Sequence, residues 1–369
     1  MFYEPLIYSE KGPWIVKGKR IMLNLSGGDI LGLASNNDFT KTFFQFLEKL
    51  DIFFYPHFIY DGQNLKVPLN TLCELKGHRK AILFKDTPTL FNLLVCHLLK
   101  KGYTLLFDEQ FEMTKILLFR NFINHAHIFP HNSFSTIKTH LNTHPDNKFA
   151  VFVQTVYPLS SQLLPVSELV EISRDERILI VVFESWADGL LGDGGEGIKS
   201  LINTLPQNWL IMGTYAHLLP FSSSYIVSSE NFLEIFESDL KEYSFNPGPS
   251  EFQAGITLWF AKFLNSEKSP LRRLNDNASY LRYELAARGF KILGDFTPLI
   301  PILIGERNKS EEFYNALLEN KILVNLLNYP VVPLGKSKIL LIPSVLHSKE
   351  DLDFALSRME KVAKSLDII

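Results

Sequence analysis

The chain has 369 residues, and its 37 Lys and Arg nearly balance its 40 Asp and Glu, giving a net charge of −3. This balance argues against a basic nucleic-acid-binding protein, and a 46% hydrophobic content with 30 Phe argues against disorder. The longest apolar runs are much shorter than the ~18 to 20 residues that a membrane span needs. At roughly 150 residues per domain, the length predicts two domains.

The N-terminus and the cysteines are typical of a cytoplasmic protein. Residues 1–12 include Glu4 and Glu10 and show no basic stretch followed by an apolar one, as an export signal would. Cys73 and Cys96 are not arranged as Cys-x-x-Cys, and we expect free thiols rather than a disulfide. We therefore expect a cytoplasmic protein with no membrane span and no nucleic-acid partner.

Short β-branched and aromatic runs recur between residues 80 and 230. Most are apolar throughout, which is typical of strands that are buried on both faces. The alternation of strands and helical patterns predicts a mainly parallel α/β sheet, which would bind ligands at the carboxyl ends of its strands. The predicted strands span residues 81–84, 103–107, 127–129, 149–153, 178–183, 209–212 and 225–227, and the predicted helices 89–101, 112–124 and 166–174.

The pattern changes after the turn-rich residues 246–249, Asn-Pro-Gly-Pro. A long helical pattern covers residues 251–288, and shorter elements follow, which predicts a separate α+β unit. Its expected strands are residues 291–293, 299–304, 322–327 and 339–343, and its expected helices are residues 310–319 and 349–365.

Two motifs carry little weight. The glycine-rich residues 192–197 satisfy the letters G-x-G-x-x-G, but no strand runs directly into them, so a turn is favoured over a dinucleotide site. His125, His127 and His131 lack a second cluster of ligands at suitable spacing, so we expect no metal site.

Residues 184–192, Glu-Ser-Trp-Ala-Asp-Gly-Leu-Leu-Gly, followed by Gly195 and Gly197, are more specific. They resemble the D-E-A-H-S-x-G-x-L-G…G-x-G segment of the pyridoxal-phosphate (PLP) dependent α-oxoamine synthases, which include 8-amino-7-oxononanoate synthase and serine palmitoyltransferase. Further matches follow in the same order along the chain. They are residues 30–35, Asp108-Glu109, His131-Asn132, Pro165, residues 212–217, residues 330–335 and His347.

The resemblance implies the type I PLP-dependent transferase fold, with a mainly parallel seven-stranded sheet and a smaller C-terminal α+β domain. We expect an N-terminal segment at 1–45, a large domain at 46–245 and a small domain at 246–369. The resemblance also implies a dimer with active sites at its interface.

The cofactor positions that the resemblance implies have lost their usual side chains. The Schiff-base lysine position holds His217, which has no primary amine to condense with an aldehyde. Phe183 replaces the carboxylate that faces the pyridine nitrogen. Glu112 stands where a histidine stacks on the ring, and Trp186 replaces the histidine beside the cofactor oxygen. Neither Lys199 nor Lys241, the nearest lysines in sequence, lies at the expected strand-to-turn position.

Four further positions concern the phosphate and the substrate. Thr87 and Pro88 replace a glycine-aromatic pair on the phosphate side, and residual non-covalent PLP would lodge near them and Thr214. Leu340 stands where an arginine would hold the substrate carboxylate, a loss of about 2 to 5 kcal/mol in binding.

These losses favour a catalytically inactive member of the family that serves as a homodimeric scaffold or as the partner of an active relative. Serine palmitoyltransferase offers a precedent, since it occurs as a heterodimer with one lysine-less subunit. Two alternatives stay open. One is an active PLP-dependent acyltransferase or aminotransferase that condenses an amino acid with an acyl thioester, and the other is a scaffold that binds an unrelated ligand.

Overall fold

The structure is a computed structural model that describes residues 7–8, 12–17, 20–48, 69–112, 126–240 and 248–369. The chain divides into two compact units. Unit 1 comprises residues 1–44, 158–162 and 268–369, and unit 2 comprises residues 45–157 and 163–267.

Unit 2 contains the predicted seven-stranded sheet, in the order β4-β12-β11-β10-β7-β5-β6. Strand β12 runs antiparallel to β11 and β4, and the other neighbours pair in parallel, which confirms the mainly parallel α/β sheet. The strands are β4 (Lys80–Phe84), β5 (Tyr103–Asp108), β6 (Ala126–Phe129), β7 (Lys148–Gln154), β10 (Ile178–Phe183), β11 (Trp209–Thr214) and β12 (Ser224–Ser228).

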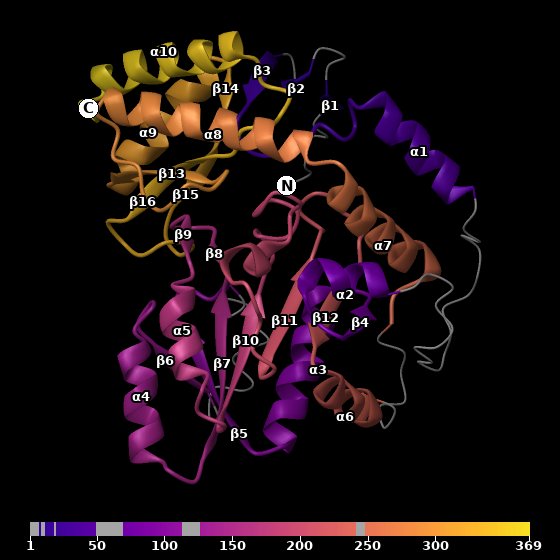
Figure 1. The fold of residues 1–369 in the computed structure, drawn as a ribbon. Coiled ribbons are helices and arrows are strands. Elements are labelled where there is room, and N and C mark those ends of the chain that lie inside the picture. The colour runs from indigo at the N-terminus through magenta and orange to yellow at the C-terminus, as the bar shows by residue number, and fades with distance from the viewer. Residues whose placement is uncertain (1–6, 9–11, 18–19, 49–68, 113–125, 241–247) are drawn as a thin grey trace. The chain divides into compact units, whose positions relative to one another are not determined.

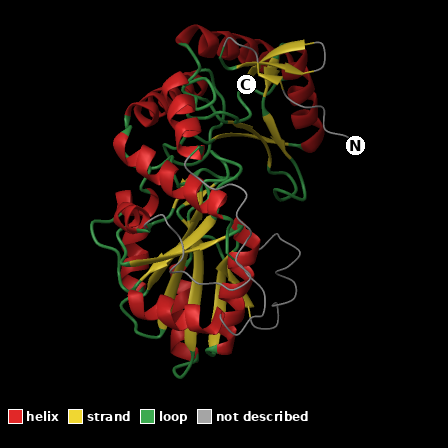
Figure 2. Cartoon of the chain, turned by 90° about the vertical axis from the view of Figure 1, so that its right-hand side faces the viewer, coloured by secondary structure: helices red, strands yellow, loops and turns green. Residues whose placement is uncertain are grey.

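Helices cover both faces of this sheet, as Figures 1 and 2 show. Helices α3 (Thr87–Lys100) and α6 (Glu230–Leu240) lie on one side of the strands, and α4 (Phe134–Thr143) and α5 (Val166–Ile172) lie on the other. Every side chain of β10 is buried, because alternate residues point to opposite, helix-covered faces. The uninterrupted apolar run that predicted this strand is therefore explained by burial on both sides.

Two further helices of unit 2 lie near the candidate site. Helix α2 (Asn70–Lys76) precedes β4 and packs against α7 (Glu251–Ser266). The predicted helix at 112–124 falls almost wholly on residues 113–125, which lie outside the described residues.

Unit 1 holds two smaller sheets. Strands β1 (Ile7–Tyr8), β2 (Trp14–Lys17), β3 (Arg20–Asn24) and β14 (Ile322–Leu323) form one, and β13 (Ile300–Gly305), β16 (Ser337–Leu341) and β15 (Asn325–Leu327) form the other. Helices α8 (Ser269–Ala287), α9 (Arg307–Glu319) and α10 (Lys349–Ser365) accompany them. A further helix, α1 (Asn37–Leu47), begins in unit 1 and ends in unit 2.

Three predicted elements are wrong in detail. The helix expected at 251–288 is two helices, since Glu267 is extended and Pro270, which has no N–H to donate, opens α8. The strand expected at 322–327 splits because β14 pairs with β3 while β15 pairs with β16. The strand expected at 291–293 is reduced to an isolated bridge between Ile292 and Ile302.

The two units differ from the expected domains in two places. Helix α7 belongs to unit 2, where it packs on α2, so the division falls after Glu267 and not near residue 246. Residues 1–44 belong to unit 1, where the parallel pairing of β3 with β14 ties the N-terminal strands to the C-terminal part of the chain. In the described ranges, no helix is both long and apolar enough to cross a membrane.

Candidate cofactor site at the carboxyl ends of the strands

The candidate site lies in unit 2, at the edge where its parallel strands end. Phe183, the last residue of β10, is in register with Gln154 at the end of β7 and with Met212 on β11. Asp108 and Thr214 end β5 and β11. Parallel strands place these residues on one edge, where α/β sheets bind ligands.

Asp108 connects the end of β5 with His131 and Asn132, a second segment that resembles the family. Its carboxylate is fully buried and lies 2.9 Å from His131 Nδ1, and it accepts a hydrogen bond from the backbone N of Asn132 at 2.9 Å. The His131 ring meets the Tyr157 ring edge-on, with centroids 4.4 Å apart. This buried group holds the end of β5 against the turn that follows β6.

Glu112 is engaged by neighbouring side chains. Ser185 Oγ donates to its carboxylate at 2.8 Å, and Gln154 Nε2 donates to the same oxygen at 3.2 Å. The backbone N of Glu112 donates to Gln154 Oε1. The position that the resemblance equates with the ring-stacking histidine therefore holds a hydrogen-bonded carboxylate.

Phe183 belongs to the hydrophobic core. It is 3% exposed and lies on the sheet face that α3 and α6 cover. Its ring centroid is 6.2 Å from that of Phe111, which packs in turn on Phe107 and Phe152. The end of β10 therefore offers an aromatic side chain and no negative charge to a pyridine nitrogen.

His217 follows β11 and is neutral at pH 7. Its Nε2 lies 2.9 Å from the carbonyl oxygen of Asp188, and because a carbonyl only accepts, Nε2 carries the proton. Nδ1 is buried and has no hydrogen-bond partner in the described part of the chain. Burial lowers the pKa of His217 to about 4, and the Lys76 ammonium lowers it further while the Asp188 carbonyl opposes the shift. The Trp186 ring lies 5.3 Å from the imidazole.

A buried ion cluster lies beneath His217, and the sequence comparison did not predict it. Lys76, the last residue of α2, is fully buried. Its Nζ donates to Glu184 Oε2 at 2.7 Å, to Asp188 Oδ1 and to the backbone oxygen of Glu196 at 3.0 Å. Burial alone would lower the pKa of Lys76, but Asp188 and Glu184 outweigh it and raise that pKa above its ordinary value. Lys76 is thus a fixed cation and not a free amine.

The two carboxylates of this cluster have further donors. Asp188 accepts from the backbone N of Thr214 at 2.8 Å and from Tyr225 Oη at 2.6 Å. Glu184 accepts from the backbone N of Ile198. Burial raises the pKa of Asp188, and the Lys76 ammonium opposes that rise. The cluster therefore joins α2, the turn after β10, β11 and β12.

Close packing around the ion cluster explains why residues 197 and 213 are glycines. A Cβ on Gly213 would collide with Asp188 Oδ2 and the Tyr225 hydroxyl, and a Cβ on Gly197 would collide with the Glu184 carboxylate. Gly197 also has a φ of 71°, in the left-handed region that favours glycine. These glycines are explained by the packing of the ion cluster, and residues 192–197 form turns rather than a strand-to-helix dinucleotide loop.

The residues expected near the phosphate, Thr87, Pro88 and Thr214, lie among hydrogen bonds within the protein. Thr87 Oγ1 lies 2.7 Å from Ser224 Oγ, and Pro88 sits in the first turn of α3. Asp86 caps this helix by accepting from the backbone N of Thr89 at 2.7 Å, so a carboxylate already lies at the positive end of the helix. Thr214 Oγ1 accepts from the backbone N of Ala216 at 3.2 Å.

The remaining predicted positions lie in unit 1, have other contacts in unit 2, or fall outside the described residues. Leu340 lies on β16 in unit 1, 6% exposed, and pairs with Pro301 and Asn325. Lys199 Nζ donates to the backbone oxygen of Glu74 at 2.6 Å, and Lys241 lies outside the described residues. His125 is also outside them, and no cluster of His, Cys, Asp or Glu suited to a metal occurs within them.

The residues at this edge do not fit covalently bound PLP. Imine formation needs a primary amine, and His217 has none, while Lys76 is held as an ammonium by two carboxylates. If these positions correspond to those of the family as the resemblance implies, the pyridine nitrogen would face Phe183, which packs on Phe111, and the phosphate would approach Asp86, which caps α3. Each contact lacks the complementary charge that the cofactor requires.

The depressed pKa of His217 predicts a loss of stability in acid. In the unfolded chain a histidine titrates near pH ~6.5, whereas His217 titrates at about 4 in the folded protein. Between these values the unfolded state binds the additional proton, so the free energy of unfolding falls as the pH is lowered, by about 3 kcal/mol between pH 7 and pH 4. The test compares urea unfolding of the wild type and of H217Q from pH 7 to pH 4. The glutamine keeps a donor for the Asp188 carbonyl but does not titrate, so the free energy of unfolding of H217Q should depend less on pH. Equal pH dependences would contradict the assignment.

Comparisons with known proteins define the class. A model of the aminotransferase class I and II family matches residues 124–358, and the chain belongs to this family. The 8-amino-7-oxononanoate synthase of Petrotoga mobilis is 30% identical over 216 residues, which cover 58% of this chain and 55% of that protein. The synthase of the same name from Fervidobacterium nodosum is 25% identical over 98% of this chain and 93% of its own length.

Solved structures agree with the fold. Sphingomonas wittichii serine palmitoyltransferase superposes with a TM-score of 0.83 at 19% identity, covering 98% of this chain and 92% of the other. This similarity establishes the type I PLP-dependent transferase fold, and the synthase relatives confirm the resemblance to the α-oxoamine synthases.

Proposed function

We propose that this chain is a catalytically inactive relative of 8-amino-7-oxononanoate synthase, one that keeps the family's fold and acts through association. The observation that carries the proposal is His217, a neutral imidazole bonded to a backbone carbonyl at the position equated with the Schiff-base lysine. An imidazole cannot form or exchange an imine.

The neighbouring side chains support the same conclusion. Phe183 is part of a packed aromatic cluster, and Glu112 is bound by Ser185 and Gln154. Lys76, a buried lysine whose partner Asp188 also bonds His217, is neutralised by Glu184 and Asp188. Substitution of one position would leave a weakened enzyme, whereas these substitutions remove the imine, the electron sink and the ring stacking together.

The proposed role is that of a dimeric scaffold in the cytoplasm, either as a homodimer or as a heterodimer with an active relative. The resemblance to dimeric enzymes is the reason for this part of the proposal. Co-purification of the tagged chain from its source cell would distinguish the homodimer from the heterodimer.

The test of inactivity is a titration of purified protein with PLP, followed by borohydride. We expect no visible absorption band that borohydride removes and no PLP-modified lysine in a peptide map. The control is a catalytically competent 8-amino-7-oxononanoate synthase in the same buffer, which should show both signals.

A reducible band that maps to one lysine would overturn the proposal. It would favour the alternative, an active PLP-dependent acyltransferase or aminotransferase that condenses an amino acid with an acyl thioester. Assays with amino acids and acyl thioesters would then be the next step.

A further inference from the structure

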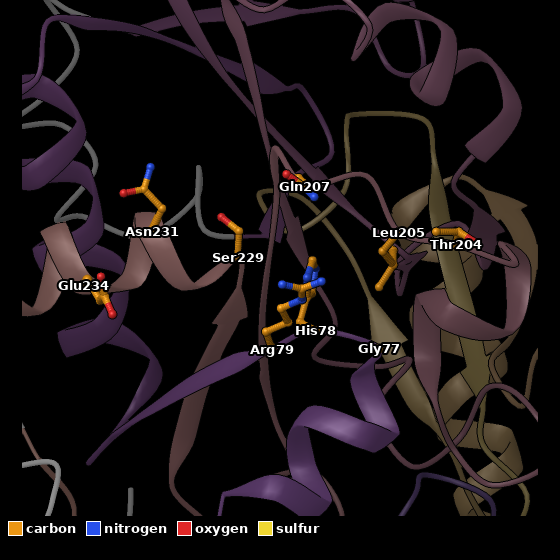
Figure 3. Close-up of a pocket in the computed structure, with 9 residues that line it drawn as sticks. All are labelled: Gly77, His78, Arg79, Thr204, Leu205, Gln207, Ser229, Asn231 and Glu234. Carbon is orange, nitrogen blue, oxygen red and sulfur yellow. The ribbon is translucent and has the colours of Figure 1, made fainter.

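A cavity of about 550 Å³ lies in unit 2, at the sheet edge opposite the candidate cofactor site. Its lining comes from the starts of β4 and β11, which run in the same direction, and from the end of β12, which runs against both. Thr87, Phe183 and Thr214 all lie at the other ends of these strands or of β10. The lining residues are Gly77, His78, Arg79, Thr204, Leu205, Gln207, Ser229, Asn231 and Glu234 (Figure 3).

The lining mixes polar and apolar groups, and two of its polar side chains have few protein partners. Arg79 is exposed and makes no ion pair with another described residue, in contrast to its neighbour Lys80, which pairs with Glu237 at 2.9 Å. The Nε2 atom of His78 is buried and has no hydrogen-bond partner in the described ranges. Burial lowers the pKa of His78 to about 4, so its ring is neutral and offers one N–H. A buried polar atom without a partner is costly unless a ligand or water satisfies it.

The charges of the cavity are separated. In Figure 3, Arg79 and His78 lie between Ser229, Asn231 and Glu234 on one side and Leu205 and Thr204 on the other. The unpaired guanidinium is suited to a phosphate, which it can bind through two parallel hydrogen bonds. Ser229 and Asn231 add polar groups where α6 begins.

Glu234 places a carboxylate in the lining, which favours a ligand with hydrogen-bond donors. It lies three residues beyond Asn231 on α6 and has no ion-pair partner among the described residues. A carboxylate next to a bound anion is unfavourable unless the ligand itself carries hydroxyl or amino donors at that point. The size of the cavity falls within the roughly 300 to 1,000 Å³ of small-molecule sites.

We propose that this cavity binds a small phosphate monoester that carries hydroxyl groups, with Arg79 on the phosphate and Glu234 on the hydroxyls. The cavity lies at the starts of β4 and β11, whereas the candidate cofactor positions lie at the other ends of the strands. One lining residue, Gly77, directly follows Lys76 of the buried ion cluster, so the cavity borders that cluster. The site would let a chain with an inactive cofactor site still respond to a metabolite.

The test uses isothermal titration calorimetry of the full chain with ribose 5-phosphate, inorganic phosphate and ribose as probes. We expect saturable binding of ribose 5-phosphate, weaker binding of phosphate and none of ribose. R79Q should weaken both phosphate ligands about tenfold or more. The matched control is K85Q, which removes a positive charge just beyond the other end of β4 and should leave binding unchanged.

E234Q separates the two parts of the site. It should weaken ribose 5-phosphate relative to inorganic phosphate, because only the sugar hydroxyls contact residue 234. The proposal is overturned if ribose 5-phosphate shows no saturable binding at millimolar concentrations, or if R79Q and K85Q behave alike. It is also overturned if T214V abolishes binding while R79Q does not, since the ligand would then lie at the cofactor edge.

Discussion

Replacing Lys76 with methionine is expected to lower the free energy of unfolding by about 3 to 5 kcal/mol, as for other buried ion pairs that lose one partner. The Lys76, Glu184 and Asp188 side chains are each 0% exposed. Without the ammonium, two carboxylates would remain buried beside each other without a neutralising charge. Urea unfolding at pH 7.5, followed by circular dichroism, measures the loss.

The matched control is K80M. Lys80 also pairs with a carboxylate, Glu237 at 2.9 Å, but these side chains are 28% and 20% exposed. Partly hydrated pairs contribute little, so we expect a loss of about 1 kcal/mol or less. The triple variant K76M/E184Q/D188N removes all three charges and should recover part of the stability lost in K76M. If K76M costs no more than K80M, the cluster does not hold the turn in place.

The sheet could be predicted from the sequence because its signal is local. Strands such as β10 are apolar at every position, and strands buried on both faces have this pattern in any parallel sheet. Pro270 was an equally local signal for the start of a helix, and treating residues 251–288 as one helix overlooked it. The split between β14 and β15 has no such signal, since it depends on which strands they pair with.

The positions of the candidate site that lie in the family-like motifs could be proposed from the sequence. The contacts that form only when distant segments pack together could not. Phe183 and His217 could be located because glycines flank them in register with the family segment. Lys76 could not, because a lysine beside a glycine at a helix end is usually exposed, and only the tertiary fold brings it to Glu184 and Asp188. The same holds for the Ser185 and Gln154 contacts of Glu112, which join residues far apart in the chain.

The double variant H217K/W186H is expected to bind PLP as a borohydride-reducible adduct at residue 217, from none in the wild type to about one per chain. Residue 217 lies in the turn after β11, and its side chain contacts the Asp188 carbonyl. Lysine restores the primary amine at this point. Histidine at 186 removes the bulk of the indole ring, whose centroid lies 5.3 Å from the imidazole. Peptide mapping after borohydride locates the adduct.

The control H217R/W186H has the same charge at residue 217 but no primary amine, and it should form no adduct. Turnover should stay absent in the lysine variant, because Phe183 still provides no carboxylate for the pyridine nitrogen and Glu112 remains bound to Ser185. A lysine variant that unfolds at the wild-type temperature yet forms no adduct would contradict the expectation, and would mean either that residue 217 is not the Schiff-base position or that Phe183 and Asp86 still exclude the cofactor. An adduct at residue 217 together with restored turnover would mean that one lost lysine accounts for the inactivity, and that Phe183 and Glu112 are compatible with catalysis.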